Sequence, residues 1–430
     1  MSSTEANRVK SLKRSYILSI LFSSVLLSAC GGSDSSNSVS TIAPKPEQPV
    51  QSNEGRLAIA NADTVRPLLS IYDLKEQKII NTTALSYTPS AMYSSPQSRY
   101  AVMLSRVDGV VQFADGGVFN KNNVLQKNAP NLLAFQLKGA TPAHYRSFNG
   151  LAALFYDGND TEVSKFDVFN DLAIEKQEIS SQKLPKKHHG VAEPRGGYVL
   201  STYLPTDATT LSVVKSYELH GDHFHEEQTL TNACNRLHGA ASIQQYAAFG
   251  CEDGVLVVEQ KGSQFIDKKV LIDQRIATIA GHEKLDKFAA FATGTHALFI
   301  VDPQHLNAVS LDWSLGAKEA DGVTPVKRLQ QVVDASGRYL AILDSAGVVH
   351  VIDTQTWQRI GQVKAIATVL STELSKSRLV VNATSGTVFL NDTQAKTIIE
   401  LDLKNLKIKQ TIQLNDVPNS FTWLGVANAL

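Results

Sequence analysis

Short apolar runs separated by turn residues recur along the chain from about residue 55 to its C-terminal end. The stretch 234–259 shows one such unit, in which a histidine in the turn Leu237-His238-Gly239 precedes three apolar runs joined by polar turns. Runs of this length, with turn signals about every 8–12 residues, are typical of consecutive antiparallel strands. The pattern therefore predicts an all-β fold made from a repeated unit.

A recurring sequence motif gives the length of the repeated unit. In this motif an apolar run ends in aspartate and is followed by a short turn and another apolar run. The phrase ends at Asp73, Asp167, Asp302, Asp353 and Asp402, and the gaps of 94, 135, 51 and 49 residues divide into steps of roughly 45–50. A four-stranded propeller blade has this size. Two β-sandwich domains would also contain regular short strands, but they would not produce this period.

We therefore predict a single β-propeller domain over 55–430. Counting units from Gly55 gives eight blades, and seven blades with one long insertion are the alternative. The terminal run 419–426 is expected to complete the first blade, which closes the ring and leaves no exposed sheet edge. We expect the protein to be a monomer.

The N-terminal residues carry the pattern of a bacterial export signal. A basic region precedes the apolar run 16–27, which is too short for a membrane-spanning helix, and the residues LSAC at 27–30 follow it. These four residues resemble the lipobox of lipoproteins, in which the cysteine becomes the acylated N-terminus. We expect a signal peptide over 1–29 and a lipidated Cys30, an ordinary secretory peptide being the alternative.

A flexible Ser/Pro-rich tether is expected over 30–54, because this segment has almost no apolar side chains to bury. Gly31 rather than aspartate follows the cysteine, which by analogy with Gram-negative lipoproteins favours the outer membrane. The folded domain would then lie in the periplasm, held to the membrane only by its lipid anchor.

Charge and cysteine content limit the possible partners and the redox state. The 41 basic residues balance the 41 acidic residues, and aromatic residues make up 7%, which argues against nucleic acid as a partner. Cys234 and Cys251 lie seventeen residues apart in the expected domain. In an oxidising compartment they are most simply a disulfide, and two thiolate metal ligands are the alternative.

Four histidines are in phase with the repeat. His144, His189, His238 and His282 are separated by 45, 49 and 44 residues, and each is expected at or just before the first strand of its blade. Because first strands line the central channel, their imidazoles would converge near the axis. Such a group suits Zn²⁺, which binds imidazole nitrogen at about 2.0–2.1 Å. His188 would replace His189 as a ligand or orient it.

We interpret the remaining histidines differently. The dense stretch His220 to Glu227 (HGDHFHEE) is expected on a solvated hairpin at a blade's outer edge, with a weak secondary metal site as the alternative. His296, His305 and His350 are expected to be structural. A histidine inherited by every repeat could also serve the fold rather than a metal, so the structural alternative applies to the in-phase set as well.

The residues HHGVAEP, CNRLHGAAS and AFGCEDGVLV resemble the AztD-type zinc metallochaperones, periplasmic β-propellers associated with zinc ABC importers. The resemblance implies a zinc site at the centre of the propeller and transfer of zinc to a solute-binding protein. His144, the His188-His189 pair and His238 match histidines of the family's motifs, and Cys234 and Cys251 match its cysteine pair. His282 depends on the spacing alone.

We therefore expect a zinc-binding, non-enzymatic metallochaperone, and its imidazole ligands would also suit other divalent ions such as copper or nickel. Two other functions remain open: a metal-dependent hydrolase, with Glu193 or Glu283 as weak candidates for the base, and a scaffold lipoprotein without metal. A nucleophile motif of the G-x-S-x-G kind is lacking. If imidazoles alone hold the ion, it should be released below about pH 6.

Overall fold

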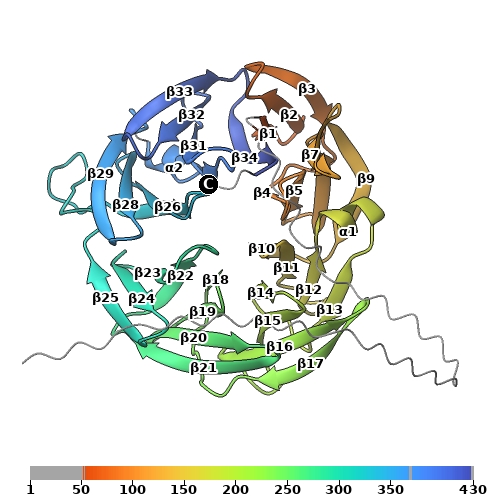
Figure 1. Cartoon of the computed structure of the whole chain (residues 1–430), viewed down its shortest axis with the longest axis vertical. Helices are drawn as coiled ribbons and strands as arrows, with labels where there is room; N and C mark the ends of the chain where they lie inside the picture. Colours follow the sequence, from red (N-terminus) through yellow and green to blue (C-terminus); the bar gives the residue numbers. More distant parts are fainter. Residues whose placement is uncertain (1–51, 53, 368–369, 428–430) are drawn as a thin grey trace, which may run out of the picture. The chain divides into compact units, whose positions relative to one another are not determined.

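The computed structural model describes residue 52 and residues 54–367 and 370–427. Within these residues it contains eight four-stranded antiparallel sheets and one two-stranded sheet. The four-stranded sheets are the blades of a β-propeller, arranged around a common centre (Figure 1). The predicted fold and its eight blades are therefore confirmed. The predicted signal peptide 1–29 and Cys30 lie outside the described residues, as does nearly all of the predicted tether.

The two ends of the described chain meet in one blade. Its strand order is β3-β2-β1-β34, so the C-terminal β34 (Pro418–Gly425) lies beside β1 (Gly55–Asn61). The outer strands of this blade are β2 (Leu68–Asp73) and β3 (Lys78–Ala84). Pairing of β1 with β34 over seven residue pairs closes the ring as the sequence predicted, and β1 has a paired strand on each side.

The next three blades run in simple sequence order from the centre outward, except that a small hairpin is inserted in the second blade. The second blade contains β4 (Ala91–Ser94), β5 (Tyr100–Ser105), β6 (Val110–Asp115) and β9 (Asn131–Lys138), with β7 (Val118–Lys121) and β8 (Val124–Lys127) as the insertion. The third contains β10 (Pro142–Phe148), β11 (Leu151–Tyr156), β12 (Lys165–Phe169) and β13 (Ser180–Lys183). The fourth contains β14 (Ala192–Arg195), β15 (Tyr198–Tyr203), β16 (Val213–His220) and β17 (His223–Thr229).

The last four blades repeat the same order. The fifth contains β18 (Ala240–Ile243), β19 (Tyr246–Cys251), β20 (Gly254–Lys261) and β21 (Gln264–Leu271), and the sixth β22 (Ile276–Ala280), β23 (Phe288–Ala292), β24 (Leu298–Asp302) and β25 (Asn307–Leu311). The seventh contains β26 (Arg328–Val333), β27 (Tyr339–Asp344), β28 (Val348–Asp353) and β29 (Gln358–Lys364). The eighth contains β30 (Leu379–Val381), β31 (Thr387–Asp392), β32 (Thr397–Asp402) and β33 (Lys407–Gln413).

Four of the five repeated aspartates have a structural role at the turn that follows the third strand of a blade, whereas Asp167 lies within β12. Asp73 ends β2, and its Oδ1 accepts hydrogen bonds from the backbone N–H groups of Lys75 and Glu76. Asp302 ends β24 and accepts in the same way from Gln304 and His305. An aspartate side chain that bonds backbone two and three residues ahead favours a tight turn. The aspartate motif therefore marks a turn of the blade and does not indicate a catalytic or binding site.

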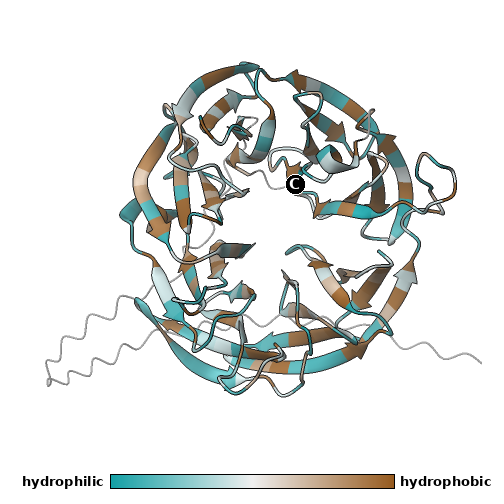
Figure 2. Cartoon of the chain, turned by 180° about the vertical axis from the view of Figure 1, so that it is seen from behind, coloured by the Kyte–Doolittle hydropathy of each residue, from teal (hydrophilic) through white to brown (hydrophobic). Residues whose placement is uncertain are grey.

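The apolar core lies within the blades and between neighbouring blades. The largest cluster of buried residues extends from Ala241 in β18 through Phe288 in β23 to Leu340 in β27, so it joins three consecutive blades. Second and third strands carry long buried runs, whereas outer strands alternate, as in β21 with its pattern eBeBeiBe. Figure 2 shows the same contrast as apolar inner strands and polar stretches along the outer ones. Second and third strands are therefore buried on both faces.

Helices are a minor part of the described structure. Helix α1 (Asp171–Lys176) follows β12, and the Asn170 side chain caps it by accepting from the backbone N–H of Ala173. Helix α2 (Ser371–Leu374) precedes β30. Neither these nor any other helix of the described part is long and apolar enough to cross a membrane.

Candidate metal centre

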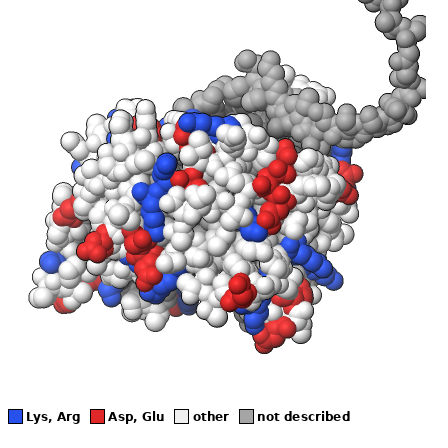
Figure 3. All heavy atoms as spheres, turned by 90° about the horizontal axis from the view of Figure 1, so that it is seen from below, with Lys and Arg blue, Asp and Glu red and all other residues white. Residues whose placement is uncertain are grey.

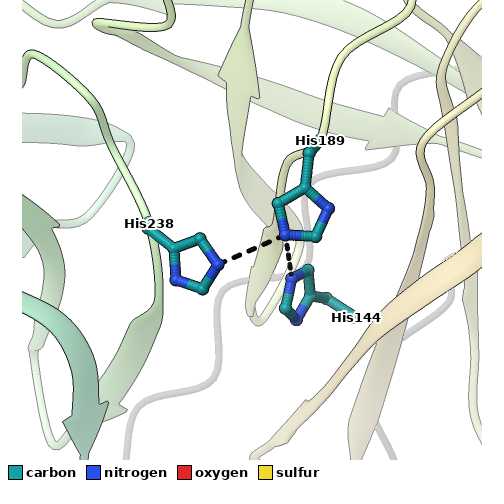
Figure 4. Close-up of side chains that lie close together, drawn as sticks. All are labelled: His144, His189 and His238. Carbon is teal, nitrogen blue, oxygen red and sulfur yellow. Dashed lines mark hydrogen bonds between the residues drawn. The ribbon is translucent and has the colours of Figure 1, made fainter. Parts of the chain in front are cut away.

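Three of the in-phase histidines converge at the inner ends of three consecutive blades. Nε2 of His189 lies 3.0 Å from Nε2 of His144 and 3.3 Å from Nε2 of His238 (Figure 4). One nitrogen of each ring lies within 4.8 Å of a nitrogen of each of the others. We call this group the inner triad.

Each member of the inner triad comes from the innermost part of its blade. His144 is on β10, which pairs with β11 in the third blade. His189 precedes β14, and His238 precedes β18 by two residues. First strands lie nearest the centre of the ring (Figure 1). Side chains near their beginnings therefore contact one another across blade boundaries.

The ring of His189 is oriented by a buried carboxylate that bonds its Nδ1 atom. Its Nδ1 lies 2.8 Å from Oδ2 of Asp157, which follows β11 in the preceding blade. The same oxygen accepts a 2.6 Å bond from the guanidinium of Arg106. Burial acts to raise the pKa of Asp157, but the hydrogen bonds from His189 and Arg106 outweigh it, so the pKa lies below its usual value. The carboxylate is therefore charged and holds the proton of His189 on Nδ1.

His238 is oriented by a backbone carbonyl of the next blade. Its Nδ1 lies 2.8 Å from the carbonyl oxygen of Ala277 in β22, and because a carbonyl can only accept, this nitrogen carries the proton. Gly239 follows with a φ of +72°, and a Cβ there would lie 2.6 Å from the same carbonyl oxygen. Only glycine allows the loop to bring His238 this close to β22.

The loop that carries His238 is fixed by the predicted disulfide. Cys234 is bonded to Cys251, the last residue of β19, and both are fully buried. The backbone N–H of His238 donates to the carbonyl of Gly250, the neighbour of Cys251. The disulfide therefore lies within four residues of His238 and ties its loop to the blade.

Hydrogen bonds at Nδ1 fix the tautomer of two rings of the triad. Because Nδ1 carries a proton in His189 and in His238, Nε2 is an acceptor when each ring is in its neutral form, and the 3.3 Å contact between the two Nε2 atoms then has no proton to share. A cation between them relieves this repulsion. In a tetrahedral zinc site with bonds of about 2.0–2.1 Å, two ligand nitrogens are about 3.3–3.4 Å apart. The separation between His189 and His238 matches this value, and the 3.0 Å separation between His144 and His189 is slightly shorter.

The environment keeps two rings of the triad neutral. Burial, reinforced by the positive charge of Arg146, lowers the pKa of His144 to about 3. Burial also lowers the pKa of His238, although the hydrogen bond to the carbonyl of Ala277 acts to raise it. Neutral imidazole is the form that binds a metal ion, so at neutral pH the site has little proton competition to overcome.

The site is small and remains open on one side. A pocket of about 10 Å³ is lined by the inner triad together with Gly190, Val191, Leu237 and Gly239, close to the space that one water molecule occupies. His189 is exposed, whereas His144 and His238 are partly buried. Three protein ligands with solvent access leave a fourth position that water or another protein's side chain can fill.

His188, the neighbour of His189, faces away from the triad. Its Nδ1 lies 3.0 Å from the carbonyl oxygen of Lys186, and its Nε2 lies 3.1 Å from Oγ1 of Thr202. Its ring also packs against Phe155, with the ring centroids 5.2 Å apart. Both nitrogens therefore have protein partners, and His188 positions the loop before β14 rather than facing the ion's place.

His282 is not part of the inner triad, and its expected position in the blade is wrong. The first strand of the sixth blade is β22 (Ile276–Ala280), so His282 follows this strand instead of preceding it. Its Nδ1 accepts a hydrogen bond from the backbone N–H of Lys284 and lies beside Gly337 of the next blade. The spacing of 44 residues placed His282 in phase, but the loops differ in length, which shifts it to the other end of the strand.

The two candidate bases for hydrolysis are not aimed at the triad. Glu193 is buried on β14, where Oε1 lies 3.1 Å from Nε of Arg146 and Oε2 accepts from the hydroxyl of Ser242. Burial raises the pKa of Glu193 despite this arginine. Glu283 follows His282 on the exposed loop after β22. Neither glutamate is in the set of side chains that line the pocket.

Three further histidines behave as the sequence suggested. His350 is fully buried in β28, with Nε2 2.7 Å from Oδ2 of Asp344 and Nδ1 accepting from Arg359. His305 lies at the turn after β24 beside Asp302, and the backbone carbonyl of His296 accepts a hydrogen bond from the indole N–H of Trp313. Each of these three histidines contacts residues that lie near it in the sequence, as expected for a structural role.

The sequence analysis missed Asp157 and Arg106. Asp157 ends the run LAALFYDG that follows His144, so a carboxylate after the second strand of a histidine-bearing blade was a usable signal. Arg106 lies in the turn after β5 and had no comparable signal, because only the packing of the second blade on the third brings it to Asp157.

Comparison with known proteins supports the same family likeness. No family model matches the chain. The zinc chaperone AztD of Citrobacter koseri is 23% identical over 386 residues, which cover 86% of this chain and 86% of that protein. The predicted resemblance to AztD-type proteins is therefore confirmed at the level of sequence similarity across most of the chain.

Solved structures show the same fold. Apo AztD from Citrobacter koseri matches with a TM-score of 0.70 at 21% identity, covering 88% of this chain and 99% of that one. A second crystal structure of Citrobacter koseri AztD gives 0.71 at 20% identity, with the same coverage. Dihydro-heme d1 dehydrogenase NirN in complex with DHE matches with a TM-score of 0.55 at 11% identity, covering 88% of this chain and 76% of that one.

Proposed function

We propose that this protein binds one zinc ion through Nε2 of His144, His189 and His238 and passes it to another protein. The observation that carries the proposal is the convergence of three Nε2 atoms, 3.0 and 3.3 Å apart, with two of the rings fixed from behind through Nδ1. Preset ligands of this kind bind an ion without reorganising the fold. The cargo ion would lie at the inner ends of the third, fourth and fifth blades.

The chemistry of the ligands favours zinc and a transferable ion. Neutral imidazoles suit a borderline ion such as Zn²⁺ better than Mg²⁺ or Ca²⁺, which prefer oxygen. With three protein ligands, the fourth position and the exposed His189 leave room for an acceptor's ligand to bind before the triad releases the ion. Stepwise exchange of ligands would deliver zinc without free ion in solution.

The similarity to a protein named zinc chaperone AztD supports handling of zinc rather than catalysis. We infer that the acceptor is the solute-binding protein of a zinc importer, as the resemblance implies. We also propose that the chain is a periplasmic lipoprotein anchored through Cys30, so that the propeller delivers zinc from the membrane surface. Metabolic labelling with a palmitate analogue, compared between wild type and Cys30→Ala, tests the anchor.

The zinc content of the purified protein tests the central proposal. Wild type and a His144→Ala, His189→Ala, His238→Ala triple variant are compared by elemental analysis and by competition with a chromophoric chelator. One tightly held zinc that the variant loses, with the circular dichroism spectrum unchanged, supports the inner triad. A wild type without tight zinc, or a variant that keeps it, overturns the proposal.

A further inference from the structure

A second layer of polar side chains lies next to the inner triad, on the first strands of the same three blades. Arg146 follows His144 by two residues on β10, and residues two apart on a strand share a face. Glu193 lies on β14 and Ser242 on β18. We call Arg146, Glu193 and Ser242 the second layer.

Polar contacts join the second layer across both blade boundaries. Nε of Arg146 lies 3.1 Å from Oε1 of Glu193, and Oε2 of Glu193 accepts a 3.0 Å hydrogen bond from the hydroxyl of Ser242. The side chain of Glu193 is 2% exposed, whereas that of Arg146 is 32% exposed. The buried carboxylate therefore fixes the guanidinium through its Nε atom and holds the charge of Arg146 beside the triad.

The positive charge of Arg146 acts on the rings of the triad. Of all charged groups, Arg146 contributes most to lowering the pKa of His144, and it also contributes to lowering that of His238. A cation that disfavours a proton on an imidazole also disfavours a metal ion there, because both bring positive charge to the same ring. Burial raises the pKa of Glu193, which limits how far this carboxylate offsets the guanidinium.

Arginine is the main source of charge on the first strands of the ring. Histidine apart, the charged residues of β4, β10, β14, β18, β22, β26, β30 and β34 are Arg146, Glu193, Arg195 and Arg328. On the face of the molecule seen in Figure 3, by contrast, acidic and basic side chains are interspersed. The strands that carry the candidate zinc site therefore have an excess of positive charge, which opposes the binding of a cation.

We propose that Arg146 lowers the zinc affinity of the inner triad, so that the ion is held loosely enough to be passed on. The inference rests on the proposed function, because it concerns the same ion. Preset imidazoles favour tight binding, and tight complexes mostly dissociate slowly. Repulsion by a fixed guanidinium weakens the binding without any change of ligand. Arg146 has no lone pair to offer and does not ligate the ion, so it acts through the electrostatic potential alone.

Arg146→Gln in the full-length protein tests the proposal, because glutamine removes the charge and keeps an amide beside Glu193. We expect the dissociation constant for zinc at pH 7.5, measured by competition with a fluorescent chelator, to fall by about tenfold. Stopped-flow transfer of zinc to excess chelator should slow by a similar factor, about tenfold. Arg146→Lys keeps the charge and should bind zinc like wild type, which a purely structural role of the arginine does not predict.

An Arg146→Gln, Glu193→Gln variant guards against unfolding, because a buried carboxylate left without its partner is destabilising. It should also bind zinc more tightly than wild type, since the charge with the largest effect on His144 is gone. Arg328→Gln is the matched control. Arg328 is likewise a partly buried arginine on a first strand, but it lies in the seventh blade, and its loss should leave the affinity unchanged.

Unchanged or weaker zinc binding in the Gln variants that keep the circular dichroism spectrum of wild type overturns the role of Arg146 and leaves the inner triad in place. Equal tightening in Arg328→Gln also overturns it, because the effect would then not belong to Arg146. A wild type without tight zinc overturns the proposed function, and this inference with it.

Discussion

His144 and His189 lie 45 residues apart in the sequence, and their Nε2 atoms lie 3.0 Å apart in the structure. The separation is one blade of the repeat. In a closed propeller, equivalent positions of neighbouring blades meet at the inner surface, so a residue repeated at the blade period becomes part of a cluster. The inner triad is therefore a consequence of the repeat, and the predictions below test how its parts contribute to the proposed zinc site.

Removal of one triad imidazole should weaken zinc binding strongly. His238→Ala deletes one of three protein ligands, and we expect the dissociation constant to rise by at least about 100-fold, more than for loss of a supporting hydrogen bond. Competition against a fluorescent zinc chelator measures this change. His282→Ala is the control, because His282 lies outside the triad, and an equal loss in that variant would contradict the assignment of ligands.

Asp157 should act through His189. Asp157→Asn keeps the shape but removes the charge that holds the proton on Nδ1, and we expect a 10–100-fold weaker zinc affinity, as is typical of such supporting groups. Equilibrium competition against the fluorescent zinc chelator measures the dissociation constant. If the Asn variant binds zinc like wild type, the carboxylate contributes only to packing, together with Arg106.

Zinc binding should release few protons. At pH 6, three histidines with an ordinary pKa near 6.5 would together release about 2.3 protons on binding zinc. The pKa of His144 is lowered to about 3 and that of His238 is also lowered, so both are neutral before binding and the triad can release at most about one. Calorimetry in buffers of different ionisation enthalpy measures the number, and a value above two would contradict the lowered pKa values.

The lowered pKa values also determine the pH at which acid should release the metal. Protons compete with zinc only below the pKa of each ligand, and lowered pKa values move this competition to more acidic pH. Zinc should therefore be retained below the pH of about 6 that ordinary histidines would predict. Dialysis at pH 5.5 followed by elemental analysis tests this, and complete loss of zinc there would count against it.

Loss of the disulfide should affect both stability and zinc. A Cys234→Ala, Cys251→Ala variant removes a link that closes a seventeen-residue separation, which contributes about 3 kcal/mol to the free energy of unfolding in the chain-entropy model. We also expect weaker zinc binding, because the loop that carries His238 is released. Urea denaturation and chelator competition measure the two effects, and unchanged affinity would show that the Gly250 contact alone holds the loop.

Closure of the ring depends on β34. Trp423 of this strand is 1% exposed and packs with Leu57 and Phe389, so Trp423→Ala should lower the free energy of unfolding by about 3–5 kcal/mol. Leu315→Ala, at an exposed position, is the control and should change little. Equal urea midpoints for the two variants would mean that the closing blade adds no stability.

The sequence by itself determined the propeller, its eight blades and the phase of three converging histidines, because apolar periodicity and repeat length are local properties of the chain. Only the tertiary structure decided which histidines meet. Thr202 and the Lys186 carbonyl turn His188 away, and loop length puts His282 after β22 rather than before it. Asp157 and Arg106 reach His189 through contacts between blades. Such contacts depend on packing across the ring, which no local pattern of the sequence encodes.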